Sequence, residues 1–154
     1  MSAAGPGPAP PVIGAALPSD LPRLAALDQA AFEQAWPQRL LAAELLHDDG
    51  LALVARSTTQ EPVAYVLFRR LPGEVELLRL ATDPAHRRRG LARALVLAGL
   101  DRLRAAGACR CHLEVRVTNL PAIQLYEALG FSRTGTRRAY YPDGTDAALY
   151  ARDL

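Results

Sequence analysis

The chain has 154 residues, of which 50% are hydrophobic, and its formal net charge at neutral pH is only +2. This length fits one domain, and the balance of apolar and charged residues excludes a disordered chain. All 18 basic residues are arginine. A net charge this small argues against a nucleic-acid partner.

The N-terminal composition and the two cysteines indicate the domain organisation and the cellular location to expect. Residues 1–11 hold only Met, Ser, Ala, Gly and Pro, so we expect a disordered leader ahead of a single domain over residues 12–154. The longest apolar helical stretch, residues 91–106, is interrupted by charges, so no membrane partner and a cytoplasmic location are expected. Cys109 and Cys111 are too few for a structural zinc site and are predicted to be reduced core thiols on one strand face.

The first half of the domain predicts one short strand, two helices and three further strands. Cap-type Ser19 and Asp20 precede apolar residues at helical spacing, and Trp36-Pro37 breaks that helix. The turn Pro72-Gly73 separates the last two strands, and the three together predict an antiparallel meander. The expected strands span residues 12–17, 51–56, 62–71 and 74–82, and the helices span residues 21–31 and 40–45.

The second half has a different pattern. After the strand over residues 74–82 come a long helix, residues 90–106, and a strand, residues 109–117. A strand, helix and strand at this spacing form a crossover, so the two strands should be parallel. A helix over residues 120–129 and strands over residues 131–139 and 147–152 complete an α/β domain, with a mixed sheet and helices on both faces.

The turn before the long helix is rich in arginine and small residues. Its sequence, Arg87-Arg88-Arg89-Gly90-Leu91-Ala92-Arg93, starts the helix, where main-chain N–H groups have no partner and the helix dipole is positive. Gly90 and Ala92 let an anion approach the backbone closely. We therefore predict a cradle for phosphate or pyrophosphate, with a solvated basic turn or a nucleic-acid-binding arm as alternatives. Neither a Walker A loop nor G-x-G-x-x-G is present.

The strand over residues 109–117 has one polar face, on which Glu114 lies. A central parallel strand is normally apolar on both faces, so this face indicates a cleft or open solvent. Glu114 is a candidate general base, or a solvated carboxylate paired with Arg116. Asn119 is expected to cap the next helix. Tyr126 on that helix is a core aromatic, or a phenol whose hydroxyl reaches a polar pocket and donates a proton to a departing thiolate.

These segments resemble the GNAT superfamily of N-acetyltransferases. Arg87 to Ala92 match its R/Q-x-x-G-x-G/A motif, and LRLATDPAHRRRGLARALV resembles the whole acetyl-CoA segment. LEVRVTNLPAIQLYEALGF and RRAYYPDGTDAALYARDL resemble the later segments, most of all in the RimI type, the ribosomal-protein-alanine N-acetyltransferases. The likeness covers about residues 12–154, and Ala92 stands where many members have Gly. The resemblance implies a GNAT-like, mostly antiparallel sheet with a central parallel strand pair.

The resemblance also implies a set of functional residues and no metal. Glu114 matches the proton acceptor and Tyr126 the proton donor, and Tyr140 and Tyr141 match paired tyrosines that line a peptide site. The residues that match acetyl-CoA contacts are Leu80, Ala81 and Thr82 for the acetyl and pantetheine part, Arg88, Arg89, Gly90, Leu91, Ala92 and Arg93 for the pyrophosphate, and Asn119.

The expected activity is transfer of an acetyl group from acetyl-CoA, by direct attack, to the α-amine of a protein N-terminus. The resemblance points to an N-terminal alanine, as in ribosomal protein S18. The alternatives are a GNAT enzyme acting on a small-molecule amine, a non-catalytic acyl-CoA-binding protein, and a nucleic-acid-binding module. The last predicts strongly salt-dependent binding, which the small net charge disfavours.

Overall fold

A computed structural model describes residues 11–154, so the predicted leader, apart from Pro11, lies outside the described residues. Within this range no helix combines the length and the apolar character that a membrane crossing needs. The strands are β1 (Val12–Ala15), β2 (Gly50–Arg56), β3 (Pro62–Leu71), β4 (Glu74–Thr82), β5 (Arg110–Arg116), β6 (Ser132–Arg137) and β7 (Ala147–Asp153). The helices are α1 (Leu21–Ala31), α2 (Gln38–Leu45), α3 (Leu91–Ala105) and α4 (Leu120–Ala128), with short 3-10 turns η1 (Pro18–Asp20) and η2 (Pro84–His86).

The strands form one seven-stranded sheet in the order β1-β2-β3-β4-β5-β7-β6. Neighbouring strands are antiparallel except β4 and β5, which run parallel because α3 connects them as a crossover. The predicted meander of β2, β3 and β4, the predicted crossover and the mixed, mostly antiparallel sheet are therefore confirmed.

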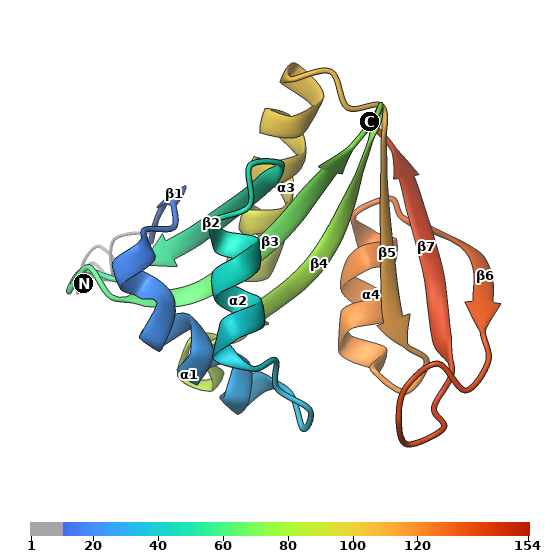
Figure 1. The fold of residues 1–154 in the computed structure, drawn as a ribbon, viewed down its shortest axis with the longest axis horizontal. Coiled ribbons are helices and arrows are strands. Elements are labelled where there is room, and N and C mark those ends of the chain that lie inside the picture. Colours follow the sequence, from blue (N-terminus) through green and yellow to red (C-terminus); the bar gives the residue numbers. More distant parts are fainter. Residues whose placement is uncertain (1–10) are drawn as a thin grey trace, which may run out of the picture.

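Helices cover both faces of the sheet, as predicted (Figure 1). On one face α1 and α2 pack mainly on β2, β3 and β4, around Leu24, Leu41 and Tyr65. On the other face α3 and α4 cover a larger core, which includes Phe68 and Leu95. Helices α1 and α2 lie over only this part of the sheet. On the face of the sheet that carries them, no helix covers β5 (Figure 1).

The two parallel strands diverge partway along their length. They are paired from Glu74 opposite Arg110 to Leu77 opposite Leu113, and no further. At the same level an extra residue in β4, Leu78, shifts its register with β3, which is a β-bulge. The remainder of β4, up to Thr82, is paired with β3 on one side and has no strand partner on the side of β5 among the described residues. Main-chain polar groups on that side of β4 therefore have no strand to bond to.

The start of the domain differs from its prediction. The first strand ends at Ala15 rather than residue 17, because η1 begins three residues later. Asp20 precedes α1 but makes no capping hydrogen bond. Its Oδ1 instead accepts a hydrogen bond of 2.8 Å from Arg56 Nη1, and its Oδ2 one of 2.7 Å from the Leu17 N–H. The hydrogen bonds from Arg56 hold the pKa of the Asp20 carboxyl below its ordinary value.

The prediction of two core thiols is correct for one cysteine and wrong for the other. Cys111 is buried and free, and burial raises the pKa of its thiol to about 12. Cys109 is free but exposed, because β5 begins only at Arg110 and the preceding residue lies outside the sheet.

Gly99 marks the closest packing of α3 on the sheet. A Cβ at this position would overlap the ring of Phe68, which is buried and held by the core. We expect Gly99→Ala to lower the free energy of unfolding by about 1–3 kcal/mol through overpacking, although alanine is the better helix former by about 1 kcal/mol. Urea denaturation measures the change. The control Gly14→Ala, where a Cβ meets nothing within 4 Å, should change it by under about 0.5 kcal/mol. Equal stability of Gly99→Ala and the wild type would contradict this packing.

Candidate active site

A cavity of about 140 Å³ lies where β4 and β5 diverge. It brings together residues from both strands, from α4 and from two segments that flank the sheet. A larger hollow of about 560 Å³ adjoins it and shares several of its residues, so the cavity continues outward between the segment after α1 and the segment after β6. The cavity is lined by Phe32, Leu77, Leu78, Arg79, Leu80, Glu114, Val115, Arg116, Asn119, Ala122, Tyr126 and Tyr141.

Glu114 lies on the polar face of β5 and lines this cavity, with a side chain that is 23% exposed. One carboxylate oxygen is 3.2 Å from Arg137 Nε on β6. The nearby Glu114 carboxylate raises the pKa of the Tyr140 phenol. The predicted alternative, an ion pair with Arg116, is wrong, because Arg116 Nη1 lies 2.9 Å from Asp143 Oδ2 instead. Glu114 is thus a carboxylate that a ligand in the cavity can reach.

Tyr126 lines the same cavity from α4. Its ring is buried and packs edge to face on Phe131, with centroids 5.7 Å apart, so it is a core aromatic. Burial raises the pKa of its phenol well above the ordinary value. The hydroxyl is therefore protonated at neutral pH, and burial also makes it a weaker acid than a free phenol. The structure places this phenol and the Glu114 carboxylate around one cavity.

Asn119 and the end of β4 complete the inner wall. Asn119 caps α4 as predicted, since its Oδ1 accepts a hydrogen bond of 3.3 Å from the Ala122 N–H. Leu80 lines the cavity, whereas the Ala81 side chain is buried in the core beneath α1 and α2. Any contact of Ala81 and Thr82 with a ligand would therefore use the unpartnered main-chain edge of β4.

The Arg-Gly turn opens α3 at the end of β4. Gly90 is the residue before the helix and has a left-handed φ of 74°, and Arg88 also has a positive φ of 63°. The first helical hydrogen bond runs from the Ala94 N–H to the Gly90 carbonyl, at 3.0 Å. The N–H groups of the first turn, which are those of Leu91, Ala92 and Arg93, are therefore free for an anion.

The arginines around this turn differ from most others in the chain. Eight arginines, among them Arg56 and Arg79, lie within ion-pair distance of carboxylates. In the described part of the chain, the four arginines of the turn have no carboxylate that close, and all four are exposed. These unpaired arginines are Arg87, Arg88, Arg89 and Arg93. Their charges and the helix start together fit a diphosphate.

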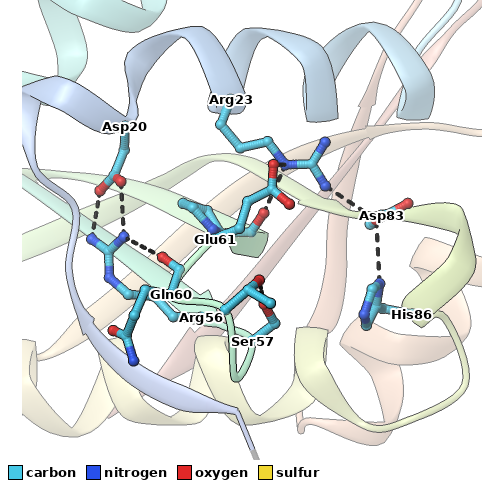
Figure 2. Close-up of polar contacts among 10 residues, drawn as sticks. Asp20, Arg23, Arg56, Ser57, Gln60, Glu61, Asp83 and His86 are labelled. Carbon is cyan, nitrogen blue, oxygen red and sulfur yellow. Dashed lines mark hydrogen bonds and ion pairs between the residues drawn. The ribbon is translucent and has the colours of Figure 1, made fainter.

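A polar network fixes the segment that leads into the turn (Figure 2). Asp83 Oδ1 accepts a hydrogen bond of 3.2 Å from the Ala85 N–H, and its Oδ2 lies 3.1 Å from Arg23 Nη2 and 3.2 Å from His86 Nδ1. Partial burial opposes ionisation of Asp83, but these hydrogen bonds outweigh it and keep the pKa below its ordinary value. Arg23 Nε also donates to the Pro62 carbonyl at 2.9 Å, so α1 and β3 hold this segment together.

Tyr140 and Tyr141 lie between β6 and β7 and pack edge to face, with centroids 5.1 Å apart. Tyr140 is 47% exposed, and Tyr141 lines both the cavity and the outer hollow. The guanidinium of Arg116 lies 4.0 Å from the centroid of the Tyr141 ring. Tyr141 is therefore at the mouth of the cavity that Glu114 lines, whereas Tyr140 packs against Tyr141 and lines neither hollow.

Two charged residues of the site, Arg79 and Asp28, were not predicted from the sequence. Arg79 lines the cavity and the outer hollow, and its guanidinium pairs with the fully buried Asp28 of α1. A signal was present, because an arginine interrupts the apolar run Leu77 to Ala81 of β4 and an aspartate lies on the buried side of α1. Charges at such positions need a partner, but periodicity alone does not identify which residue it is.

Comparison with known proteins assigns the class. The model of the acetyltransferase (GNAT) family matches residues 21–131, so the chain belongs to this family of acetyltransferases. The resemblance predicted from the Arg-Gly turn and the later segments is confirmed.

Several relatives are named for N-terminal acetylation. The [ribosomal protein bS18]-alanine N-acetyltransferase of Escherichia coli (strain K12) is 34% identical over 85% of this chain and 88% of its own. The crystal structure of the Escherichia coli ribosomal-protein-S18-alanine N-acetyltransferase superposes with a TM-score of 0.87 at 32% identity, covering 93% of each chain. The N-alpha-acetyltransferase RimI of Mycobacterium tuberculosis is 36% identical over 94% of this chain and 93% of its own. An uncharacterised Mycobacterium leprae protein is 39% identical over 94% of this chain, which spans only 41% of that relative.

Proposed function

We propose that the protein transfers the acetyl group of acetyl-CoA to the α-amine of a protein N-terminus, with an N-terminal alanine, as in ribosomal protein S18, as the preferred acceptor. The observation that carries the proposal is that one cavity, at the divergence of β4 and β5, is lined by both Glu114 and Tyr126. An acceptor amine must lose a proton and a leaving thiolate must gain one, and these two groups supply both. The relatives named for alanine acetylation support the choice of acceptor.

Acetyl-CoA is expected to bind along the end of β4 and the start of α3. The first-turn N–H groups of α3 and the unpaired arginines around Gly90 would hold the pyrophosphate. The open main-chain edge of β4 from Leu80 to Thr82 would hold the pantetheine and acetyl part, with Asn119 beside it. The acidic Glu114 and the buried phenol of Tyr126 would then flank the thioester.

The reaction then needs no covalent intermediate on the protein. Glu114 accepts a proton from the acceptor ammonium, directly or through a water, and the free amine attacks the thioester carbonyl carbon. As the new C–N bond forms, main-chain N–H groups at the end of β4 stabilise the oxyanion. The C–S bond breaks and Tyr126 gives its proton to the thiolate, so that CoA leaves as the thiol. The new amide nitrogen loses its second proton, which reprotonates Tyr126, and the proton held by Glu114 passes to solvent before the next turnover.

A thiol-release assay with acetyl-CoA and peptides that differ only in their first residue tests the proposal. We expect turnover with a free N-terminal alanine, slower turnover with other first residues, and none when the terminus is already acetylated. Mass spectrometry should locate the acetyl group on the α-amine. Because Cys109 is exposed, each reaction needs a blank without peptide.

Two results would replace the proposal by its alternatives. Turnover of a polyamine or an aminoglycoside, with none of any peptide, would identify a small-molecule acetyltransferase. Tight binding of acetyl-CoA without turnover of any amine would identify a non-catalytic acyl-CoA-binding protein.

Tyr126→Phe removes one oxygen and leaves the packed ring in place. We expect kcat to fall about 10- to 100-fold, because the thiolate must leave without its proton donor. The dissociation constant for acetyl-CoA and the thermal midpoint should stay close to the wild type, since the ring still packs on Phe131. Steady-state kinetics and a binding titration measure both quantities. A variant as active as the wild type would remove Tyr126 from the mechanism.

A further inference from the structure

One buried ion pair of the site has no part in the mechanism above. Asp28 is fully buried in α1, and its carboxylate lies 2.8 Å from Arg79 Nε and 2.9 Å from Arg79 Nη2. The Tyr65 hydroxyl donates a further hydrogen bond to it, and so does the Trp36 N–H, at 2.7 Å. Replacing such a pair with apolar residues is often neutral or favourable for stability, so stability is a weak reason for its presence.

The contacts of Arg79 converge on the segment between α1 and α2. Its guanidinium carbon lies 3.5 Å from the centroid of the Phe32 ring and 5.1 Å from that of the Trp36 ring. Its Nη2 also donates a hydrogen bond of 3.2 Å to the Gln34 carbonyl. One side chain on β4, together with Asp28, therefore contacts the segment near its start, middle and end.

This segment forms one wall of the opening that leads to the cavity. Residues 32–36 line the outer hollow opposite Tyr141 and Asp143. Gln34 Oε1 accepts a hydrogen bond of 3.3 Å from Arg116, whose Nη1 pairs with Asp143 at 2.9 Å. A continuous polar chain thus runs from Asp28 through Arg79, Gln34 and Arg116 to the segment after β6.

We propose that Arg79 is a positioning residue for the acceptor: clamped by Asp28, it holds residues 32–36 as the wall against which the acceptor peptide lies. The inference rests on the proposed function, because it concerns how the same site takes its peptide. Arg79 acts through the segment and not on the reacting atoms. Its loss should therefore weaken the use of the acceptor while acetyl-CoA, held at the start of α3, binds as before.

Trp36 is the only tryptophan in the sequence, so tryptophan fluorescence reports on the environment of residues 32–36 alone. In Arg79→Met we expect the Trp36 emission to shift to longer wavelength and its quenching by acrylamide to rise about twofold, as the segment is released. The KM for an alanine-starting peptide should rise about tenfold, with the dissociation constant for acetyl-CoA within about twofold of the wild type. The matched control is Arg69→Met, since Arg69 also pairs with a helix carboxylate, that of Glu44, but lines neither hollow.

A second variant covers the case in which Arg79→Met does not fold because Asp28 is left unpaired. Arg79→Lys keeps the positive charge but cannot make the two-point contact or the stacking, so we expect the same changes, with a KM increase of about threefold. Two results in a variant that folds would overturn the inference. One is a changed Trp36 emission and quenching with an unchanged KM for the peptide, and the other is a Trp36 emission and quenching equal to those of the wild type. A wild type that acetylates no peptide would instead overturn the proposed function, and this inference with it.

Discussion

Glu114→Gln is expected to lower kcat about 100-fold or more, the largest effect of any single change in the site. The substitution keeps the size of the side chain and its place on β5 but removes a group that can accept a proton. Loss of the ion pair with Arg137 of the edge strand β6 should cost little stability, because both side chains are partly exposed. The dissociation constant for acetyl-CoA should be close to that of the wild type, because we expect the pyrophosphate to bind at the start of α3.

The control for this variant is Glu127→Gln on α4, which makes the same chemical change away from the cavity. Glu127 accepts a hydrogen bond of 2.8 Å from the Tyr150 hydroxyl, and glutamine can still accept it. Its kcat should match the wild type. Full activity of Glu114→Gln near neutral pH, with the control equally active, would show that another group takes the proton.

Gly90→Asp should weaken acetyl-CoA binding about tenfold or more, which is the second large effect we expect. The substitution puts a negative charge among the four unpaired arginines, at the N–H groups where the pyrophosphate is expected. It also adds a side chain at a φ of 74°, which glycine adopts without strain. A binding titration gives the dissociation constant, and salt should reduce the difference between variant and wild type.

Gly73→Asp is the matched control, because it separates backbone strain from charge in the cradle. Gly73 has a φ of 73°, and a Cβ there meets nothing within 4 Å, as at Gly90. It lies in the turn between β3 and β4, at the opposite end of β4 from the Arg-Gly turn. Both variants should lose similar stability, and only Gly90→Asp should lose affinity. Equal affinities of the two variants would contradict a diphosphate site at the start of α3.

The parts of the fold that could be predicted from sequence are those that local patterns specify. The spacing from the strand before the Arg-Gly turn to the strand after Gly107 predicts a crossover, and β4 and β5 are indeed parallel. Alternation along β5 predicts that Glu114 lies on a polar face. That this face borders a cavity follows from the position of α1 and α2 over the other strands, which is a tertiary property.

The partners of the charged residues could not be predicted, because they come from distant parts of the chain. The sequence neighbour Arg116 was the natural partner for Glu114, yet Arg137 of β6 holds it and Arg116 pairs with Asp143. Asp28 and Arg79 are 51 positions apart and meet only after α1 packs on the sheet. Hydrophobic periodicity places side chains on faces, and it carries no information about which charges on a face meet.

The most direct test is a crystal structure of the protein with CoA and an alanine-starting peptide. The account predicts the pyrophosphate on the N–H groups of Leu91 to Arg93, and the sulfur between the end of β4 and the Tyr126 hydroxyl. The peptide amine should lie within reach of Glu114, directly or through one water. A nucleotide bound elsewhere on the protein, or a sulfur distant from both Glu114 and Tyr126, would contradict it.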